Sequence, residues 1–403
     1  MNKAIAACLG VIIGVSPCSF ADTNETNAKA RAIAQNYIIL DAHIDLPFRL
    51  TQKWQDVTKA TPDGDFDYPR AIQGGLNAPF MAIYTPATLD GKPQAFTHAN
   101  KMIDSVLAIA STAPKKFAVA TSAQSVLDHF QQGLISLPMG MENGSPIAGD
   151  MKNLQHFYDR GVRYITLTHS QSNHISDSSY DLRRKWQGLS PFGKELLVAM
   201  NNMGMMIDIS HVSEQAFYQV MALSRAPVIA SHTSLRQFTP GFERNMDDKM
   251  LKALAKNGGV IQINFGSSFV SQLANTWYDL MAVKRNTFDK QYGRGSPQSK
   301  SFERRYRRKS PYPYATLETV LDHIDHAVKL VGINHVGIGS DFDGVGDSLP
   351  EGLKDVSAYP NLIAGLLNRG YTEQEIEKIL SGNFLRVWRE VENIAEQNNT
   401  KHE

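Results

Sequence analysis

Residues 206–232 read MIDISHVSEQAFYQVMALSRAPVIASH, a stretch with two strand patterns and a helical pattern between them. The apolar runs Met206–Ile209 and Val228–Ala230 are nearly continuous rather than alternating, which is typical of parallel strands buried on both faces. Ser213 can cap a helix that continues through Leu223. Strand, helix and strand in this order form the repeating unit of α/β folds.

The same alternation of strand and helix patterns extends over most of the chain. Eight strands separated by helices predict a (β/α)8 TIM-like barrel, and a doubly wound open sheet is the alternative. Helix starts are predicted at Ser190-Pro191, at Asp247, at Thr316 and at the capping box that begins with Thr372. The other six predicted strands are Tyr37–Asp41, Pro79–Tyr84, Leu137–Met141, Tyr164–Leu167, Val260–Ile263 and Val336–Ile338.

Composition narrows the class of protein. The 403 residues include 41 Lys and Arg and 40 Asp and Glu, and this near balance argues against a general nucleic-acid binder. Hydrophobic residues make up 42% and charged residues 20%, as in globular proteins. The only two cysteines, Cys8 and Cys18, are too few for a disulfide scaffold or a Cys-rich zinc module.

The N-terminus has the pattern of a secretory signal peptide, residues 1–21. Lys3 precedes the apolar run Ala4–Val15, which is too short to span a bilayer, and small residues Ser19 and Ala21 precede the expected cleavage point. An uncleaved anchor is the alternative. We therefore expect export, most simply to a periplasm, and a single barrel domain over residues 22–403 without a transmembrane anchor.

Two other segments call for interpretation. Residues 284–309 contain ten Lys and Arg but two acidic residues, and we interpret them as a solvated loop or an insertion between the last two strands rather than a nucleic-acid or anion-binding patch. Gly188–Lys194 matches the start of a phosphate-binding loop, but Glu195 replaces the hydroxyl residue that would bind magnesium, so we treat the match as chance.

Histidines and carboxylates follow the predicted strands where those strands end. The carboxyl ends of barrel strands form the active-site face, and imidazole with carboxylate is a suitable ligand set for divalent metals. We interpret Asp41 and Asp208 as structural carboxylates, and we expect His98, His323 and His326 at the surface. The candidates at strand ends are His43, Asp45, Glu142, His211, His232, Asp341 and Asp343, enough for two metal ions if Glu142 bridges them.

Nine stretches, in order along nearly the whole chain after residue 21, resemble the membrane (renal) dipeptidase family of zinc metallopeptidases in the amidohydrolase superfamily. They are DAHIDLP at 41–47, GMENG at 140–144, GVRYITLTHS at 161–170, GLSPFG at 188–193, MIDISHVS at 206–213, VIASHTS at 228–234, RNMDD at 244–248, HVGIGSDFDG at 335–344 and SGNFLRVW at 381–388.

The resemblance implies a binuclear metal site. His43 and Asp45 would bind one ion, His211 and His232 would bind the second, and Glu142 would bridge them. It further implies Zn²⁺ as the metal and a metal-bridging hydroxide as the nucleophile.

The resemblance also implies three roles in substrate binding and catalysis. His169 would polarise the scissile carbonyl, Arg244 would hold the terminal carboxylate, and Asp341 would bind the amino group and pass a proton to the leaving amine. From position alone, Arg236 is the alternative to Arg244 and Asp343 the alternative to Asp341.

The family implies a dipeptidase of the membrane dipeptidase type that also accepts a C-terminal D-residue, and a homodimer. The alternatives are another metal-dependent hydrolase of the superfamily, such as a lactonase or a β-lactam hydrolase, a non-catalytic exported binding protein, and an adhesin. Ile44 and Asn143 depart from the family pattern, where a polar Asn and a Gly are common.

Overall fold

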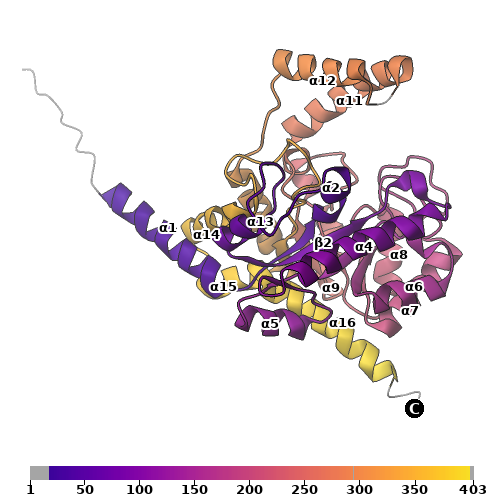
Figure 1. Ribbon diagram of the computed structural model, residues 1–403, viewed down its shortest axis with the longest axis horizontal. Coiled ribbons are helices and arrows are strands. Elements are labelled where there is room, and N and C mark those ends of the chain that lie inside the picture. The colour runs from indigo at the N-terminus through magenta and orange to yellow at the C-terminus, as the bar shows by residue number, and fades with distance from the viewer. Residues whose placement is uncertain (1–17, 294, 400–403) are drawn as a thin grey trace, which may run out of the picture.

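An eight-stranded parallel sheet forms the centre of the molecule, in the strand order β1-β2-β5-β6-β7-β8-β9-β10. A computed structural model describes residues 18–293 and 295–399 (Figure 1). The predicted signal peptide lies outside the described residues except for its last four positions, and it remains a prediction. The strands are β1 (Ile39–Ile44), β2 (Leu76–Tyr84), β5 (Met139–Glu142), β6 (Val162–Thr166), β7 (Met206–Asp208), β8 (Ile229–Ala230), β9 (Val260–Ile263) and β10 (Val336–Ile338).

The first and last strands meet and close the sheet into a barrel. Ile44 forms a parallel bridge with Phe342, and the Asp45 N–H donates a hydrogen bond to the Phe342 carbonyl at 2.9 Å. Closer to the start of both segments, the Asp341 N–H donates a hydrogen bond to the His43 carbonyl at 3.1 Å. The predicted (β/α)8 fold is thus confirmed, and the open doubly wound sheet is wrong.

Helices surround the barrel and connect its strands (Figure 1). No helix within the described ranges is both long and apolar enough to cross a membrane. The helices are α1 (Cys18–Asn36), α2 (Leu46–Gln52), α3 (Tyr68–Gly74), α4 (Gln94–Thr112), α5 (Ala123–Gln131), α6 (Met151–Asp159), α7 (Pro191–Met203), α8 (Glu214–Leu223), α9 (Asp248–Lys256), α10 (Ser267–Val270), α11 (Gln272–Tyr292), α12 (Pro297–Lys309), α13 (Leu317–Val331), α14 (Tyr359–Asn368), α15 (Glu373–Glu377) and α16 (Asn383–Asn399).

The predicted helix caps explain where several helices begin. The Ser190 hydroxyl accepts a hydrogen bond from the Gly193 N–H at 2.8 Å and starts α7. Ser213 does the same for α8, Asp247 caps α9, and Thr372 forms the predicted capping box of α15. These side chains satisfy backbone N–H groups that have no partner inside the helix.

The basic segment is helical instead of a loop. It contributes the end of α11 and all of α12, which lie between β9 and β10 and project from the barrel (Figure 1). Aromatic side chains join the two helices: Phe288 stacks on Phe302 at 4.5 Å, and Trp277 meets Tyr306 at 5.2 Å between ring centroids. The many charges obscure this apolar spacing in the sequence.

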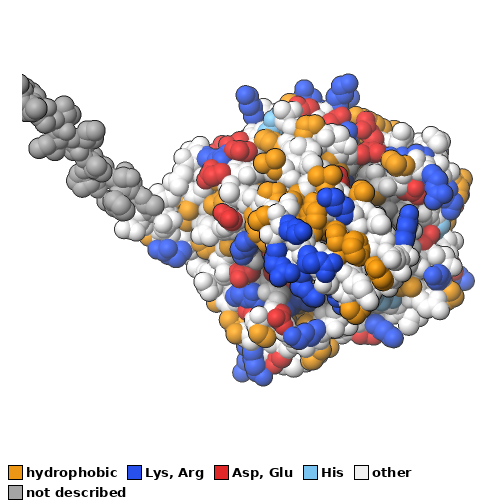
Figure 2. All heavy atoms as spheres, turned by 90° about the horizontal axis from the view of Figure 1, so that it is seen from above, with side chains coloured by type: hydrophobic (Ala, Val, Ile, Leu, Met, Phe, Trp, Pro, Cys, Tyr) orange, Lys and Arg blue, Asp and Glu red, His pale blue; other side chains and the backbone are white. Residues whose placement is uncertain are grey.

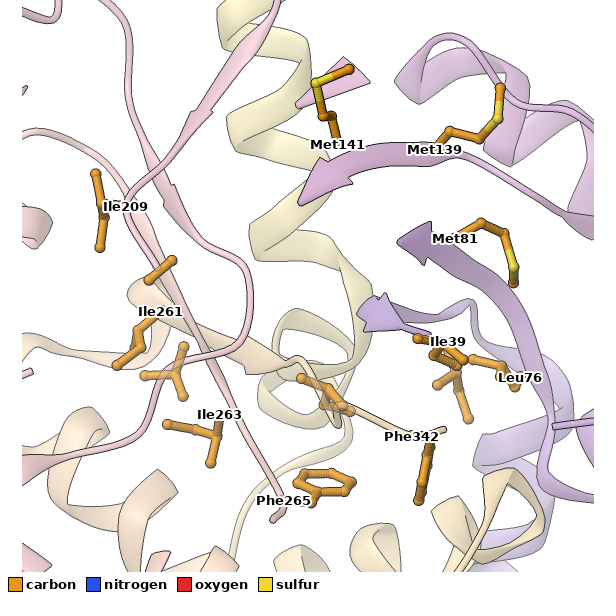
Figure 3. Packing of buried hydrophobic residues seen from close by; sticks show 14 of the residues in the cluster. Ile39, Leu76, Met81, Met139, Met141, Ile209, Ile261, Ile263, Phe265 and Phe342 are labelled. Carbon is orange, nitrogen blue, oxygen red and sulfur yellow. The ribbon is translucent and has the colours of Figure 1, made fainter. Parts of the chain in front are cut away.

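Two layers of apolar side chains support the barrel. One lies between the strands and the surrounding helices and includes Ile39, Met81, Met139 and Ile263 (Figure 3). In the other, Phe80 of β2 packs against Tyr164 of β6 and against Phe384 and Trp388 of α16, with ring centroids 5.1–5.2 Å apart. This second layer places the Tyr164 hydroxyl directly beside His43.

His323 is wholly buried, so the expectation that it lies at the surface is wrong, whereas His98 and His326 are half-buried. On α13 it shares the buried face with Val320, Ile324 and Ala327. Its Nδ1 accepts a hydrogen bond from the Leu235 N–H, and its Nε2 donates to the Val270 carbonyl, both at 3.1 Å. These two bonds require the neutral ring.

We expect His323 to make the fold sensitive to mild acid. Burial lowers its pKa from 6.5 to about 4, so the unfolded chain binds the proton first and stability falls as the pH drops from 6.5 towards 4. At pH 5 this group should cost about 2 kcal/mol relative to pH 7. Urea unfolding of the wild type and of His323→Gln at both pH values checks this. Equal pH dependence of the two proteins would contradict it.

Candidate active site

The predicted strand-end residues converge at one end of the barrel. His43 lies in β1 and Glu142 ends β5, while His211, His232 and Asp341 follow β7, β8 and β10. Asp45 directly precedes α2. Each of these six side chains is at most 8% exposed, so the cluster is a buried group of ligand-type residues. The space-filling view in Figure 2 shows one outer face of the molecule, where Lys and Arg side chains lie among apolar ones.

Glu142 is at the centre of the cluster. One carboxylate oxygen, Oε2, lies 3.6 Å from His43 Nε2. The other, Oε1, lies 3.3 Å from His211 Nε2 and 3.4 Å from His232 Nε2. Since the two oxygens face different histidines, Glu142 is placed to bridge two cations.

Two further residues complete the halves of this cluster. His43 Nε2 is 3.5 Å from Asp45 Oδ2, and donor atoms of His43, Asp45 and Asp341 lie within 4.8 Å of one another. On the other side, His169 Nε2 lies 3.4 Å from Glu142 Oε1. His169 and Asp341 therefore stand close enough to contact whatever the cluster binds.

Hydrogen bonds orient His43 as a ligand. Its Nδ1 lies 3.0 Å from the Tyr164 hydroxyl, which itself donates to the Ala42 carbonyl at 3.0 Å. The hydroxyl must therefore accept a hydrogen bond from the Nδ1–H group, which in the neutral ring leaves a lone pair on Nε2. That Nε2 is buried and has no hydrogen-bond partner among the described residues, as expected for an atom that faces a metal ion.

His232 is oriented in the same way through Asp208. The Ser231 hydroxyl donates to Asp208 Oδ2 at 2.6 Å and lies 2.7 Å from His232 Nδ1, so it accepts a hydrogen bond from the Nδ1–H group. His232 Nε2 is then free to bind a cation. Asp208 also accepts a hydrogen bond from Thr166 Oγ1 at 2.5 Å, which fits a structural carboxylate.

Asp41 is likewise held away from the cluster. It accepts hydrogen bonds from the Ser340 N–H, the His43 N–H and the Tyr359 hydroxyl. Burial raises the pKa of Asp41 to about 6, although these hydrogen bonds oppose the shift. Its position supports the interpretation that Asp41 is a structural carboxylate that stabilises the first strand.

The electrostatics of the cluster favour a bound cation. Burial lowers the pKa of His211 and of His232, in the latter to about 3, so both rings are in the neutral form that binds metals. Burial opposes the charge on His43 and on Glu142. Tyr164 and the neighbouring carboxylates nevertheless raise the pKa of His43, and the charges of His169 and His43 hold the pKa of Glu142 well below its ordinary value. A site that attracts a proton this strongly also attracts a metal ion that displaces it.

Several residues at the site have a left-handed backbone, which is uncommon for residues other than glycine. Asn143, His211 and Asp341 have φ values of 71°, 69° and 65°. The position after Glu142 thus suits the Gly of the family pattern, and Asn143 fills it because its side chain makes local hydrogen bonds. Its amide donates to the Thr85 carbonyl at 2.8 Å, and its carbonyl accepts from Ser145 Oγ at 2.9 Å.

A cavity of about 690 Å³ leads from the cluster to the surface. This volume is typical of small-molecule sites. Its base includes Asp45, Glu142, His169, His211 and Asp341, so it gives access to both halves of the cluster. Its walls include side chains that the sequence motifs do not contain, namely Tyr180, Phe242, Tyr278, Asp279, Arg307 and Tyr312.

Arg244 is buried beside the cluster. Its guanidinium donates to Thr233 Oγ1 at 2.9 Å and to the His232 carbonyl at 2.7 Å, while its Nε has no partner in the described chain. Arg236 instead forms an ion pair with Glu214 at 2.9 Å. Neither arginine is among the residues that line the cavity, but the charge of Arg244 acts on the pKa of His211.

Asp343 is engaged away from the cluster. Its Oδ1 accepts a hydrogen bond from the Asp65 N–H at 2.6 Å, and its Oδ2 lies 3.1 Å from Arg49 Nε. By contrast, Asp341 lines the cavity and accepts a hydrogen bond from Asn264 Nδ2 at 2.7 Å. The geometry therefore favours Asp341 over Asp343 as the carboxylate that meets a substrate.

Comparison with known families agrees with this geometry. Residues 27–402 match the model of the membrane dipeptidase family, peptidase family M19. The chain belongs to this family. It is therefore related to metallopeptidases that cleave dipeptides, and its His and Glu clusters are the expected place for divalent metal.

Individual relatives support the same assignment. The chain is 31% identical to an uncharacterized dipeptidase of Schizosaccharomyces pombe, over 91% of this chain and 84% of the relative. The probable dipeptidase PvdM from Pseudomonas aeruginosa has a similar structure, with a TM-score of 0.81, 28% identity and coverage of 92% of this chain and 100% of that chain. A metallopeptidase from Rhodobacter sphaeroides, solved with a phosphinate mimic of the dipeptide L-Ala-D-Ala, has a TM-score of 0.73 and 26% identity, over 88% of this chain and 100% of that chain.

Proposed function

We propose that this protein is a binuclear zinc dipeptidase of the membrane dipeptidase type. The observation that carries the proposal is the position of Glu142. Its carboxylate oxygens lie 3.3–3.6 Å from the Nε2 atoms of three histidines, one in β1 and the other two just after β7 and β8. His43 and Asp45 would hold one Zn²⁺, His211 and His232 the other, and Glu142 both. Bound zinc would supply a hydroxide nucleophile between the two ions at neutral pH by lowering the pKa of water.

The chain's own residues would supply the remaining steps of peptide hydrolysis. His169 lines the cavity beside Glu142, where an N–H of its ring can donate to the carbonyl oxygen of the scissile bond as negative charge develops there. Asp341 lies across the base of the cavity, where its carboxylate can bind the substrate amino group and pass a proton to the leaving nitrogen.

Recognition of both ends of the substrate would limit the enzyme to dipeptides. Arg244 is a buried guanidinium beside the metal ligands, with an unpaired Nε among the described residues, and a guanidinium is suited to a carboxylate. A longer peptide cannot place its amino group at Asp341 and its carboxylate at Arg244 together. The dipeptide mimic in the Rhodobacter sphaeroides relative supports acceptance of a C-terminal D-residue. Export to a periplasm and a homodimeric state remain predictions of the sequence.

Hydrolysis of defined peptides tests this function. Zinc-loaded protein should release free amino acids from dipeptides such as L-Ala-L-Ala and L-Ala-D-Ala, a chelator should stop the release, and zinc should restore it. The matched tripeptide L-Ala-L-Ala-L-Ala should be cleaved much more slowly because it cannot satisfy both ends of the site. If protein that retains two metal ions releases nothing from any dipeptide, the proposed function is wrong.

A further inference from the structure

The helical hairpin formed by α11 and α12 covers part of the active-site cavity. Asn275, Tyr278 and Asp279 of α11 line it, and their spacing of three and four residues puts them on one face of the helix. Arg307 of α12 lines it as well. The side chain of a bound substrate that extends away from the metal ligands would therefore meet the hairpin.

The hairpin is held in place where it meets the cavity. Trp277 packs edge-on against Tyr312 at 4.9 Å, and its indole N–H donates to the Ser310 carbonyl at 2.9 Å. Arg307 lies over both rings, 5.2 Å and 5.4 Å from their centroids, and its guanidinium reaches Asp347 at 3.5 Å. The charge of Arg307 is thus already engaged by neighbours within the chain.

Asp279 differs from Arg307 in this respect. Its carboxylate lines the cavity, yet it forms no hydrogen bond or ion pair with the rest of the described chain. Residues 272–309 contain ten Lys and Arg and only three acidic residues, yet none of the described cations among them pairs with Asp279. Partial burial raises its pKa, with no cation to offset that effect. The side chain is exposed, so its carboxylate can pair with an external cation at little desolvation cost.

Asp279 lies on the side of the cavity where we expect the C-terminal residue of the substrate. Tyr180 lines the cavity together with Asp279, and its ring lies 5.9 Å from that of His211. The Arg244 guanidinium lies 5.5 Å from the Phe269 ring, which in turn contacts Phe242 at 5.9 Å. Tyr180 also contacts Phe242, with ring centroids 6.1 Å apart. If Arg244 holds the terminal carboxylate, the side chain of the C-terminal residue points towards Tyr180 and Asp279.

We propose that Asp279 is a specificity-determining residue that selects dipeptides whose C-terminal residue carries a cationic side chain. The ammonium or guanidinium group of that residue would pair with the Asp279 carboxylate, while its methylene groups would pack against Tyr180 and Tyr278. This inference rests on the proposed dipeptidase function and adds a substrate class to it.

The test compares two dipeptides that differ in one ammonium group, Ala-Lys and Ala-norleucine, in the configuration that the enzyme accepts. Asp279→Asn should lower kcat/KM for Ala-Lys about 5-fold, mainly through KM, because a partly exposed ion pair contributes about 1 kcal/mol. Turnover of Ala-norleucine should stay the same. Asp279→Glu should keep the preference for Ala-Lys, and Asp279→Lys should shift it to Ala-Glu.

Asp289→Asn is the matched control, since it makes the same change on the same helix outside the cavity, where Asp289 lies 3.9 Å from Arg285. It should leave the ratio of kcat/KM for the two dipeptides unchanged. A ratio that Asp279→Asn does not alter would overturn the proposal. Calorimetric binding of both dipeptides to metal-free protein separates failure of the specificity site from failure of the proposed function, because it needs no turnover. Tighter binding of Ala-Lys than of Ala-norleucine, lost in Asp279→Asn, supports the specificity site. Equal affinities of the wild type for the two dipeptides overturn it.

Discussion

Glu142→Gln is expected to abolish metal binding and dipeptide turnover together. The substitution keeps the size of the side chain but removes the charge that two groups of histidines surround at 3.3–3.6 Å. The substituted side chain could offer one amide oxygen to a cation, whereas its NH₂ group would face the other ligands and repel the second cation. Both halves of the site should therefore lose affinity, and not only one.

The expected loss of kcat/KM is at least about 10³-fold, because bound metal ions stabilise the transition state by several kcal/mol. Metal content of the purified variant, measured by atomic emission, should fall from two ions per chain towards zero. Glu390→Gln on α16, which removes a surface carboxylate near Arg386, is the control and should change neither quantity. A Glu142→Gln protein that keeps two ions and normal turnover would show that Glu142 does not bridge them.

The cluster of candidate metal ligands could be predicted because of how parallel barrels are built. All strands point the same way, so a polar residue at the end of each buried run reaches the same end of the barrel. His211 and His232, for example, are 21 positions apart, yet their Nε2 atoms lie 2.8 Å apart. The exact limit of the first strand was harder to predict, because polar Asp41 and His43 interrupt the apolar run although β1 continues to Ile44.

The walls of the cavity could not be predicted in this way. Tyr180 comes from the long connection between β6 and α7, and Tyr278 and Asp279 come from the hairpin between β9 and β10. The place of such connections depends on packing contacts, such as those of Trp277 with Tyr306 and Tyr312, and not on a repeating pattern. The small paired strands β3 (Phe117–Ala118) and β4 (Ile135–Ser136) escaped prediction because two residues carry no periodicity.

Arg244 could be predicted only in part. Its sequence motif is recognisable, but the contacts of its side chain could not be predicted from the sequence. The chain after β8 folds back so that the guanidinium bonds to Thr233 and to the carbonyl of His232, a candidate metal ligand. This places a permanent positive charge next to His211, and burial together with that charge keeps the pKa of His211 low. The same charge would attract the carboxylate of a substrate bound over the metal ions.

Arg244→Met is therefore expected to lower kcat/KM for dipeptides by about 10²- to 10³-fold, as is usual when one partner of a buried charge pair is removed. Arg236→Met is the comparison variant. Arg236 pairs with Glu214 and donates to the Asn245 carbonyl at 2.9 Å, so its loss should affect turnover far less than loss of Arg244, and only through the position of this segment. Circular dichroism of both variants shows whether the fold is retained.

A substrate with an amidated C-terminus separates carboxylate binding from a structural role of Arg244. The wild type should prefer the free dipeptide over its C-terminal amide by about the same 10²- to 10³-fold factor, since the amide lacks the charge that Arg244 would bind. Arg244→Met should lose this preference and hydrolyse both substrates at similar low rates. If the variant still discriminates against the amide as strongly as the wild type, another group holds the carboxylate and Arg244 only positions His232 through its backbone.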